Sequence, residues 1–434
     1  MNWRLVVRAL RHRNYRLFFG GQGISLIGTW MTRVATGWLV YRLTGSAFLL
    51  GLVSFSGQIP ILLLGPVAGV WVDRLNRHRV LVVTQVLSML QSFGLAALAL
   101  SGVITVPEII LLNLFQGTVN AFDMPARQAF VIEMVEDHED LGNAIALNSS
   151  LVNAARLIGP SIAGLVIAGF GEGYCFLIDG FSYMAVIVSL LAMRVAMRQT
   201  AESHESVLSE LREGWDYVCG FHPIWSILLL LALVSLVGMP YTTLMPIFAG
   251  KILHGGAHTL GFLMAASGVG ALIGAVTLAA RRSVLGLGRV IPMTAGTFGA
   301  ALIVFAASRQ IWLSLLLLVV TGFSFMQQMA SSNTILQTIV EHRKRGRVMS
   351  FYSMAFQGVA PFGSLIAGAT ASRIGAPHTL MIGGTICICG AALFAVQLPT
   401  LRKLIRPIYV RMGIIHELAA GIHTASLLQE PPED

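Results

Sequence analysis

Long apolar stretches recur along the chain, and short polar turns separate them. A helix of about 20 apolar residues crosses the ~30 Å hydrocarbon layer of a bilayer. Twelve stretches reach that length, at residues 17–41, 47–72, 79–102, 107–126, 144–170, 173–194, 223–250, 259–280, 288–308, 311–334, 348–374 and 377–399. The pattern predicts an all-α integral membrane protein with twelve transmembrane helices. A further segment, 207–218, has the amphipathic pattern of a helix that lies at the membrane surface.

Polar residues interrupt some spans at steps of three and four, which places them on one face of a helix. Lipid offers polar side chains no partner, so such a face turns toward protein or a watery cavity. The clearest stripes lie on the first, fourth and tenth spans: Gln22, Ser25, Thr29, Arg33 and Thr36; Asn113, Gln116, Asn120, Asp123 and Arg127; Ser324, Gln328, Ser331 and Thr338. Each stripe therefore predicts a helix face that turns toward a watery cavity, with hydrogen bonding between helices as the alternative.

Composition and charge agree with a membrane protein. Hydrophobic residues make up 55% of the chain, charged residues 11%, and the mean hydropathy is +0.75. The net charge of +9 follows the topology, since 23 of the 29 lysines and arginines fall on one side of the predicted membrane and four on the other. Positive loops stay inside, so both ends are predicted to be cytoplasmic, and nucleic acid is not an expected partner. Three of the four cysteines lie in predicted spans, and we expect no metal and no cofactor.

The turn after the second span carries the most specific motif, Gly-Val-Trp-Val-Asp-Arg-Leu-Asn-Arg-His-Arg at residues 69–79. It resembles the loop signature of the major facilitator superfamily, Gly-x-x-x-Asp-Arg-x-Gly-Arg-Lys/Arg. Asn76 replaces the usual glycine, and we expect it to tolerate a left-handed backbone. The resemblance implies that Asp73 braces the amino end of the eleventh helix and that Arg77 pairs with Asp123 at the inner end of the fourth. The implied inner gate comprises Gly69, Asp73, Arg74, Arg77, Arg79 and Asp123.

The fifth span adds a second motif, Gly159-Pro160 followed by Gly164, which resembles the Gly-Pro motif associated with antiporters of the superfamily. Small residues let helices approach closely, and proline bends them. Shorter segments at 45–46, 123–128 and 176–183 resemble the enterobactin-exporter-like and macrolide-efflux-like branch. An acidic turn (Glu133, Glu136, Asp137, Glu139 and Asp140) and a basic turn (Arg343, Lys344, Arg345 and Arg347) are predicted to pair across the closed gate, or else to be solvated.

The second half of the chain repeats the first. Residues 142–164 align without gaps on 346–368, and residues 51–80 align on 261–290. The repeat predicts two six-helix halves related by an axis along the membrane normal, as in this superfamily. The predicted organisation is a basic arm (1–16), an N-terminal half (17–194), a central loop with an interfacial helix (195–222), a C-terminal half (223–399) and a cytoplasmic tail (400–434).

Three charges, Arg33, Arg156 and Asp179, lie inside predicted spans, where a charge costs several kcal/mol and marks function. Arg33 and Asp179 have matching depths, so they form either a structural ion pair or a coupling site. In the second case Asp179 exchanges a proton while Arg33 or Arg156 holds an anionic or polar substrate. Exporters of the resembled branch often carry an acid near Thr29, which this chain lacks, so Asp123 is the other proton-coupling candidate.

The sequence therefore predicts a secondary active transporter that exports an amphipathic small molecule, siderophore-like or drug-like, by alternating access with proton antiport. The alternative is uptake or facilitated transport of a small metabolite without proton antiport. The cavity candidates are Gln22, Arg33, Asn120, Asn148, Arg156 and Gln328. No clustered nucleophile, base or metal set points to an enzyme, and the single asymmetric charge set does not fit the ring of charges of a channel. We expect a monomer in the cell membrane, with the lipid bilayer, protons and the substrate as its partners.

Overall fold

The computed structural model describes residues 8–135, 137–194, 207–281 and 283–414, and for a few of these, Asp73 among them, it describes the backbone alone. These residues form helices joined by short turns, and no strand is assigned within them. The all-α prediction is confirmed. Glu136, residues 195–206 and residues 415–434 lie outside the described residues.

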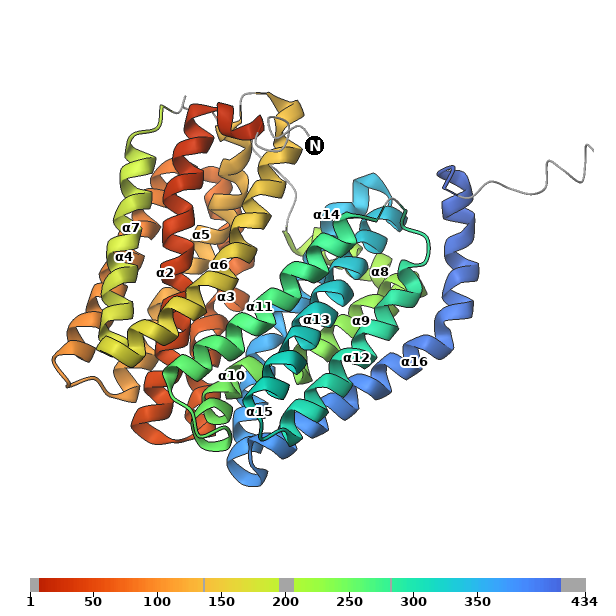
Figure 1. Ribbon diagram of the computed structural model, residues 1–434. Helices are drawn as coiled ribbons and strands as arrows, with labels where there is room; N and C mark the ends of the chain where they lie inside the picture. The colour runs from red at the N-terminus through yellow and green to blue at the C-terminus, as the bar shows by residue number, and fades with distance from the viewer. Residues whose placement is uncertain (1–7, 136, 195–206, 282, 415–434) are drawn as a thin grey trace, which may run out of the picture.

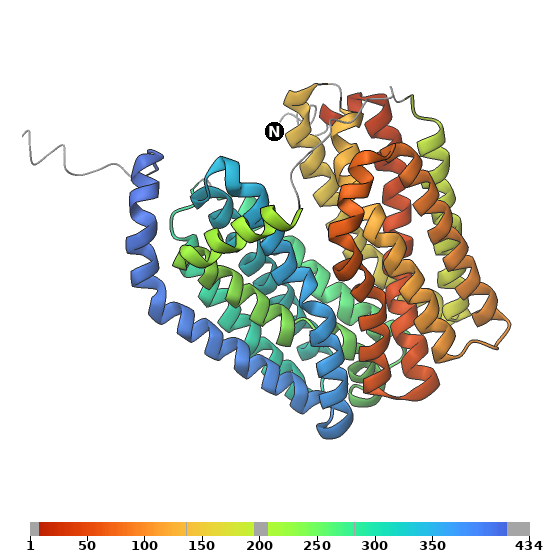
Figure 2. The same cartoon turned by 180° about the vertical axis from the view of Figure 1, so that it is seen from behind.

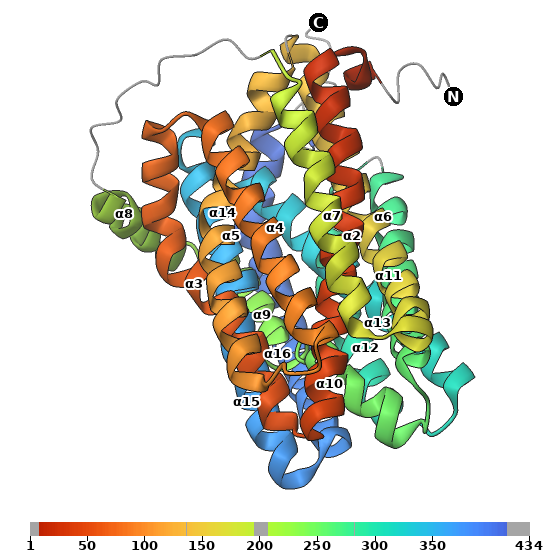
Figure 3. The same ribbon diagram turned by 90° about the vertical axis from the view of Figure 1, so that its left-hand side faces the viewer.

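The first bundle is built from six long helices (Figure 3). They are α2 (Arg13–Thr44), α3 (Ala47–Arg74), α4 (Arg77–Leu100), α5 (Val106–Met134), α6 (Leu141–Phe170) and α7 (Glu172–Leu191). Two short 3₁₀ helices, η1 (Arg8–Arg11) and η2 (His138–Asp140), precede α2 and α6.

The second bundle follows α8 (Val207–Gly220), the helix that the amphipathic pattern predicts. It comprises α9 (His222–Val237), α10 (Tyr241–Ile247), the π-helical turn η3 (Phe248–Ile252), α11 (Ala257–Ala279), α12 (Leu287–Ala307), α13 (Ile311–Ile339), η4 (His342–Lys344), α14 (Arg345–Ser353), the π-helical turn η5 (Met354–Gly358), α15 (Ala360–Ile374) and α16 (Ala376–Arg411). α16 continues well beyond residue 399, where the sequence places the end of the last span, so the first part of the predicted tail is helical.

Each of the twelve predicted spans coincides with one of these helices or with a run of them. By length and apolar composition, nine helices of the described residues could cross a membrane. The spans on α2, on α5 and on the run from α14 to α15 are not among the nine, and α2 and α5 are the helices with two of the polar stripes. Composition alone therefore does not reproduce the count of twelve.

Individual residues at the turns end α2 and cap the first turns of α3 and α4. Gly45 ends α2 with a φ of 61°, a left-handed conformation that glycine adopts without a steric cost. The next residue, Ser46, accepts a hydrogen bond from the backbone N–H of Leu49 and so caps α3. Asn76 does not adopt the left-handed conformation that we expected it to tolerate. Its φ is −68°, and its side chain accepts from the backbone N–H of Arg79 to cap α4.

The two bundles meet at one end and diverge toward the other (Figure 1). We call the end with the turns at residues 45–46, 171 and 375 the lower face, and the end where α2 begins and α16 ends the upper face. At the lower face α3 crosses α15 at Gly51 and Gly368, and α6 crosses α11 at Gly164 and Gly261. Each of these glycines lies within 3.1 Å of its partner's Cα, measured from the position that a Cβ would take. The absence of a side chain lets the helices touch backbone to backbone.

The internal repeat explains why these contacts come in pairs. The alignment places Gly164 on Gly368 and Gly51 on Gly261, so the contact of Gly164 with Gly261 maps onto that of Gly368 with Gly51. The helices that close the lower face are therefore related by the pseudo-symmetry that the sequence predicts.

Candidate transport cavity

A cavity of about 330 Å³ lies between the two bundles. α2, α3, α5 and α6 line it on one side, and Met239 with residues of α10, α11 and α15 lines it on the other. Its wall mixes polar side chains such as Asn113 and Gln58 with apolar ones such as Val53 and Met264. Such a lining suits a molecule with both apolar and polar parts.

Arg33 and Arg156 supply the charge of the cavity wall. Both guanidinium groups lie near the ring of Trp30. Its ring centroid is 4.8 Å from Cζ of Arg33 and 5.7 Å from Cζ of Arg156. Among the described residues, no carboxylate forms an ion pair with either arginine. Two cations beside one indole ring give the cavity a positive character and leave guanidinium donors for a ligand.

Asp179 lies in α7, behind α2 as seen from the cavity, and is only 2% exposed. Its carboxylate accepts hydrogen bonds from the hydroxyls of Thr32 at 2.8 Å and Ser92 at 2.9 Å. Ser182 Oγ lies 3.4 Å from the other carboxylate oxygen. The described residues form no ion pair with Asp179, so the predicted pair with Arg33 is absent from this structure. Arg33 instead points to Trp30 and the cavity, although its neighbour Thr32 bonds to Asp179.

The cavity contains three of the six predicted cavity residues, namely Arg33, Asn120 and Arg156. Gln22 is 2% exposed and Gln328 is fully buried, and neither lines the cavity. Both side-chain polar atoms of Gln328 lack a hydrogen-bond partner. Asn148 is half-buried on α6 and also lies outside the cavity wall. Periodicity identified the polar face of each helix, but it could not show how far along the helix the cavity extends.

Two aromatic residues of the cavity wall, Trp30 and Tyr241, were missed. Tyr241 begins α10, and its hydroxyl hydrogen-bonds with Ser267 Oγ at 2.6 Å. Trp30 lies three residues before Arg33, on the same face of α2, and this spacing was the available signal.

The predicted inner gate lies at the upper face, with different partners from those expected. Arg77 donates to Glu133 at 2.7 Å, so Glu133 is the acid of α5 that it contacts. Asp123 lies deeper in the bundle and is only 2% exposed. It forms an ion pair with Arg127, one helical turn away, and accepts hydrogen bonds from Thr84 and Gln85. Two other gate residues, Arg74 and Arg79, are exposed and form no ion pair with a described residue. A Cβ added at Gly69 would have no neighbour within 4 Å. The side chain of Asp73 lies outside what the structure describes.

The motif of the fifth span serves close packing on two sides. Gly159 faces α2, where a Cβ would lie 2.5 Å from Cβ of Trp30. Gly164 faces α11 at the lower face, and Pro160 between them lines the cavity. One helix therefore connects the cavity wall with the contact between the bundles.

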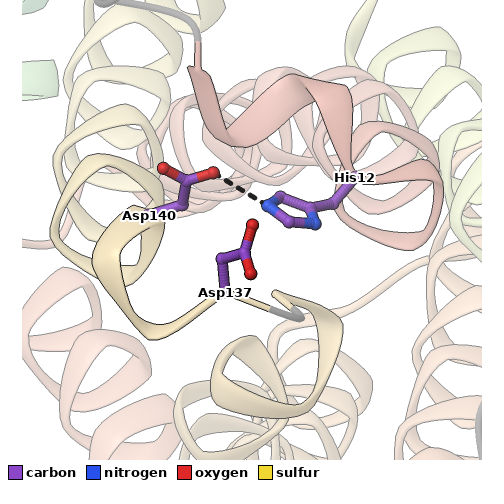
Figure 4. A group of neighbouring side chains, drawn as sticks. All are labelled: His12, Asp137 and Asp140. Atoms are coloured by element: carbon purple, nitrogen blue, oxygen red, sulfur yellow. Dashed lines mark hydrogen bonds and ion pairs between the residues drawn. The ribbon is translucent and has the colours of Figure 1, made fainter.

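Acidic side chains at the upper face pair within the first bundle. Asp137 and Asp140 lie beside His12, and His12 Nε2 hydrogen-bonds with Asp140 Oδ2 at 2.9 Å (Figure 4). Arg11 forms ion pairs with both carboxylates, and Arg8 forms one with Asp140. Burial raises the pKa of the Asp140 carboxyl, but the hydrogen bond from His12 and the charges of Arg11 and Arg8 outweigh it and hold that pKa below its ordinary value. His12, Asp137 and Asp140 could also surround a cation, yet the two arginines already neutralise the carboxylates.

The basic turn has its own partners in the second bundle. Arg347 forms an ion pair with Glu213 of α8, and Nζ of Lys344 lies 4.3 Å from the ring centroid of Tyr217. Among the described residues, no ion pair joins the acidic turn to the basic turn. For the part of the chain that the structure describes, the predicted pairing across the gate is therefore not formed in this conformation, in which the bundles diverge at the upper face (Figure 1).

Two pseudo-symmetric helical bundles around a shared cavity define a transporter of the major facilitator superfamily. The model of the transmembrane secretion effector family matches residues 7–407, and the chain belongs to that family. It is similar to the staphyloferrin A transporter of Staphylococcus aureus, with 26% identity over 87% of this chain and 95% of that protein. It is 27% identical to the multidrug efflux pump Tap of Mycolicibacterium fortuitum, over 87% and 93% of the two chains. Macrolide efflux protein A of Streptococcus pyogenes is 23% identical, over 91% and 99%.

Solved transporters share the fold. A bacterial homologue of the human lysosomal transporter Spinster, in an inward-facing and unoccupied conformation, aligns with a TM-score of 0.68 and 14% identity over 91% of this chain and 98% of its own. A bacterial homologue of the iron transporter ferroportin, in an inward-facing state, aligns with a TM-score of 0.68 and 16% identity over 90% and 98%. The chain is a multi-pass membrane transporter of small molecules and not an enzyme.

Proposed function

We propose that this transporter exports an amphipathic small molecule that carries an anionic or strongly hydrogen-bond-accepting group, by alternating access coupled to proton entry. The observation that carries the proposal is the arrangement around α2. Arg33 and Arg156 offer the cavity positive charge that no described carboxylate pairs with, and Thr32, next to Arg33, bonds to the buried carboxylate of Asp179. The relatives support export, because two of them are named as efflux proteins; the third is named as a staphyloferrin A transporter.

Asp179 is the proposed proton site. A buried carboxylate without a cationic partner is costly in a membrane protein, and binding a proton removes that charge. The hydroxyls around it can hydrogen-bond with either protonation state. α2 packs tightly on α7 here, since a Cβ on Gly28 would lie 2.6 Å from Oδ1 of Asp179. A change in the bonds of Asp179 therefore acts directly on the helix that carries Arg33.

Asp123 is the weaker candidate for proton exchange. Its carboxylate already forms an ion pair with Arg127 and accepts hydrogen bonds from Thr84 and Gln85, so these partners hold it in place. We assign it to the inner gate, with Arg77 and Glu133 above it.

The upper face is proposed to be cytoplasmic, because the lysines and arginines of the turns concentrate there. In that orientation the bundles meet at the outer face and diverge at the inner one, so the structure corresponds to a state open to the cytoplasm. We also propose the plasma membrane as location, a monomer as the working unit, and a division into two halves joined by residues 195–222.

Everted membrane vesicles with an imposed pH gradient test this function. Accumulation of macrolides, dyes and siderophores, among them staphyloferrin A, is measured for the wild type, for Asp179→Asn and for Asp216→Asn, which removes an exposed acid of α8. Uptake that an uncoupler abolishes, that Asp216→Asn retains and that Asp179→Asn loses would support the proposal. Gradient-driven uptake that survives in Asp179→Asn would exclude Asp179 as the coupling site. Transport only in the opposite direction would make uptake the function.

A further inference from the structure

A second cavity, of about 370 Å³, lies in the second bundle at the upper face, away from the transport cavity. It is formed where α9 and α12 begin and where α13 and α16 end. Its wall is mostly apolar and includes Ile227, Leu398 and Tyr409. α16 changes direction along its course (Figure 2), and Pro399 and Pro407 lie inside this helix. The helix thus encloses an apolar groove. Transport of a substrate through the other cavity would not require this groove.

Arg289, Arg402 and Arg406 line the same cavity. Among the described residues, none of the three side chains forms an ion pair or a hydrogen bond. Arg289 lies close enough to Arg402 for their positive charges to repel each other. Guanidinium groups that no described residue pairs with favour binding of an anion, and their planar donors match a phosphate.

The combination of groove and charge identifies the chemistry of the occupant. A free phosphate would satisfy the arginines but would leave the apolar groove empty, and a neutral acyl chain would do the opposite. An anionic phospholipid satisfies both, and basic pockets between transmembrane helices on the cytoplasmic side bind such headgroups. Leu285, 42% exposed, borders the cavity.

We propose that this cavity binds one anionic phospholipid, with its phosphate at Arg289, Arg402 and Arg406 and an acyl chain along Ile227 and Leu398. The proposal rests on the assignment of the upper face to the cytoplasmic leaflet, but the binding measurement below does not depend on transport, its direction or its coupling.

The test is native mass spectrometry of the full chain in detergent, titrated with phosphatidylglycerol and, in parallel, with phosphatidylcholine. The wild type is expected to retain one phosphatidylglycerol and to bind phosphatidylcholine much more weakly. Neutralising the site in R289Q/R402Q/R406Q should weaken phosphatidylglycerol binding by about 100-fold, at about fivefold per arginine. The matched variant R343Q/K403Q/R411Q removes three exposed or partly exposed cations outside the cavity wall and should bind as the wild type does.

A second variant separates the headgroup from the chain. Leu398→Trp fills the groove and keeps the arginines, so it should also weaken phosphatidylglycerol binding. Unchanged binding in Leu398→Trp, together with competition by inorganic phosphate, would show an anion site without a lipid chain and overturn the proposal. Equal losses in both triple variants would show nonspecific attraction and overturn it as well.

The acidic end of the chain is the other conceivable occupant, with Glu430, Glu433 and Asp434 as its charges. If it filled the cavity, E430Q/E433Q/D434N would bind phosphatidylglycerol more tightly than the wild type. The proposal requires no such gain, and a gain of tenfold or more would assign the cavity to the chain's own end.

Discussion

The glycine contact at the lower face should control which side of the transporter is open. In Gly261→Ala the new Cβ would lie 2.6 Å from the carbonyl oxygen of Pro160 and 2.9 Å from Cα of Gly164. Both neighbours are backbone atoms of α6, so they cannot rotate away, and ordinary contact requires the helices to separate. Overpacking of this kind costs ~1–3 kcal/mol. The cost falls only on the state in which α6 and α11 touch, so it should shift the ratio of the two states by about 5–150-fold away from the present one.

Distances between spin labels measure this shift. One pair of labels, at Gly169 and Arg309, reports on the lower face, and a second pair, at Glu139 and Arg343, reports on the upper face. The exposed cysteines Cys219 and Cys389 would be replaced by serine first. In Gly261→Ala the lower-face distances should lengthen and the upper-face distances should shorten.

Gly142→Ala is the matched control, because it places a methyl group on α6 where nothing lies within 4 Å. Its distance distributions should equal those of the wild type. If Gly261→Ala also kept the wild-type distributions, the lower-face contact would not limit opening, and the reasoning from backbone contact would be refuted.

Three further predictions concern the cavity, the upper face and the gate motif. Arg33→Gln and Arg156→Gln should each reduce transport of anionic probes by about tenfold or more, with a smaller effect on neutral ones, in the vesicle assay; equal effects on both probe types would contradict a charge role. Because the pKa of folded Asp140 lies below its ordinary 3.8, its carboxylate stabilises the fold fully above about pH 3.8 and loses this contribution as the pH falls through the folded pKa. Asp140→Asn should therefore unfold at a lower temperature than the wild type at neutral pH, and the difference should vanish in strong acid. Asn76→Ala should destabilise the protein by ~0.5–2 kcal/mol in thermal unfolding through loss of the α4 cap, whereas Asn76→Gly should cost only a few tenths, and equal losses would show that the cap does not matter.

Much of the fold could be predicted because membrane insertion imposes it locally. The length of an apolar run and the sign of a turn's charge are properties of short segments, and every predicted span coincides with a helix. The repeat could be predicted for the same reason, since residues such as Gly164 and Gly368 align without gaps. What the sequence did not show was that these glycines meet Gly261 and Gly51, because that depends on how two distant segments cross.

The candidate site was predicted less well. Whether a residue belongs to it depends on its depth along the helix and on the side chains that it contacts. Arg33 and Arg156 could be singled out as charges in apolar spans, and they line the cavity. Gln328 belongs to an equally regular stripe and is fully buried. The ion pair expected between Arg33 and Asp179 failed for a related reason. Equal depth along two helices does not fix the direction in which a long side chain points, and the guanidinium group of Arg33 lies over the ring of Trp30.

The unequal halves of the repeat suggest how the chemistry and the movement are divided. The alignment of residues 142–164 on 346–368 places Ala360 opposite Arg156, and continued without a gap into the next helix it places Gly383 opposite Asp179. Ala360 lines the cavity without charge, and Gly383 packs so closely on the backbone of Val237 that a side chain there would collide. The second bundle therefore cannot hold a copy of the buried carboxylate in this packing. Rocking of two bundles requires equivalent contacts at their interface, which the glycines supply, but it does not require equivalent charges. Under the proposed function, protonation of Asp179 in the first bundle alone is sufficient, because α2 connects this carboxylate with the cavity, so the second bundle can act as a rigid partner.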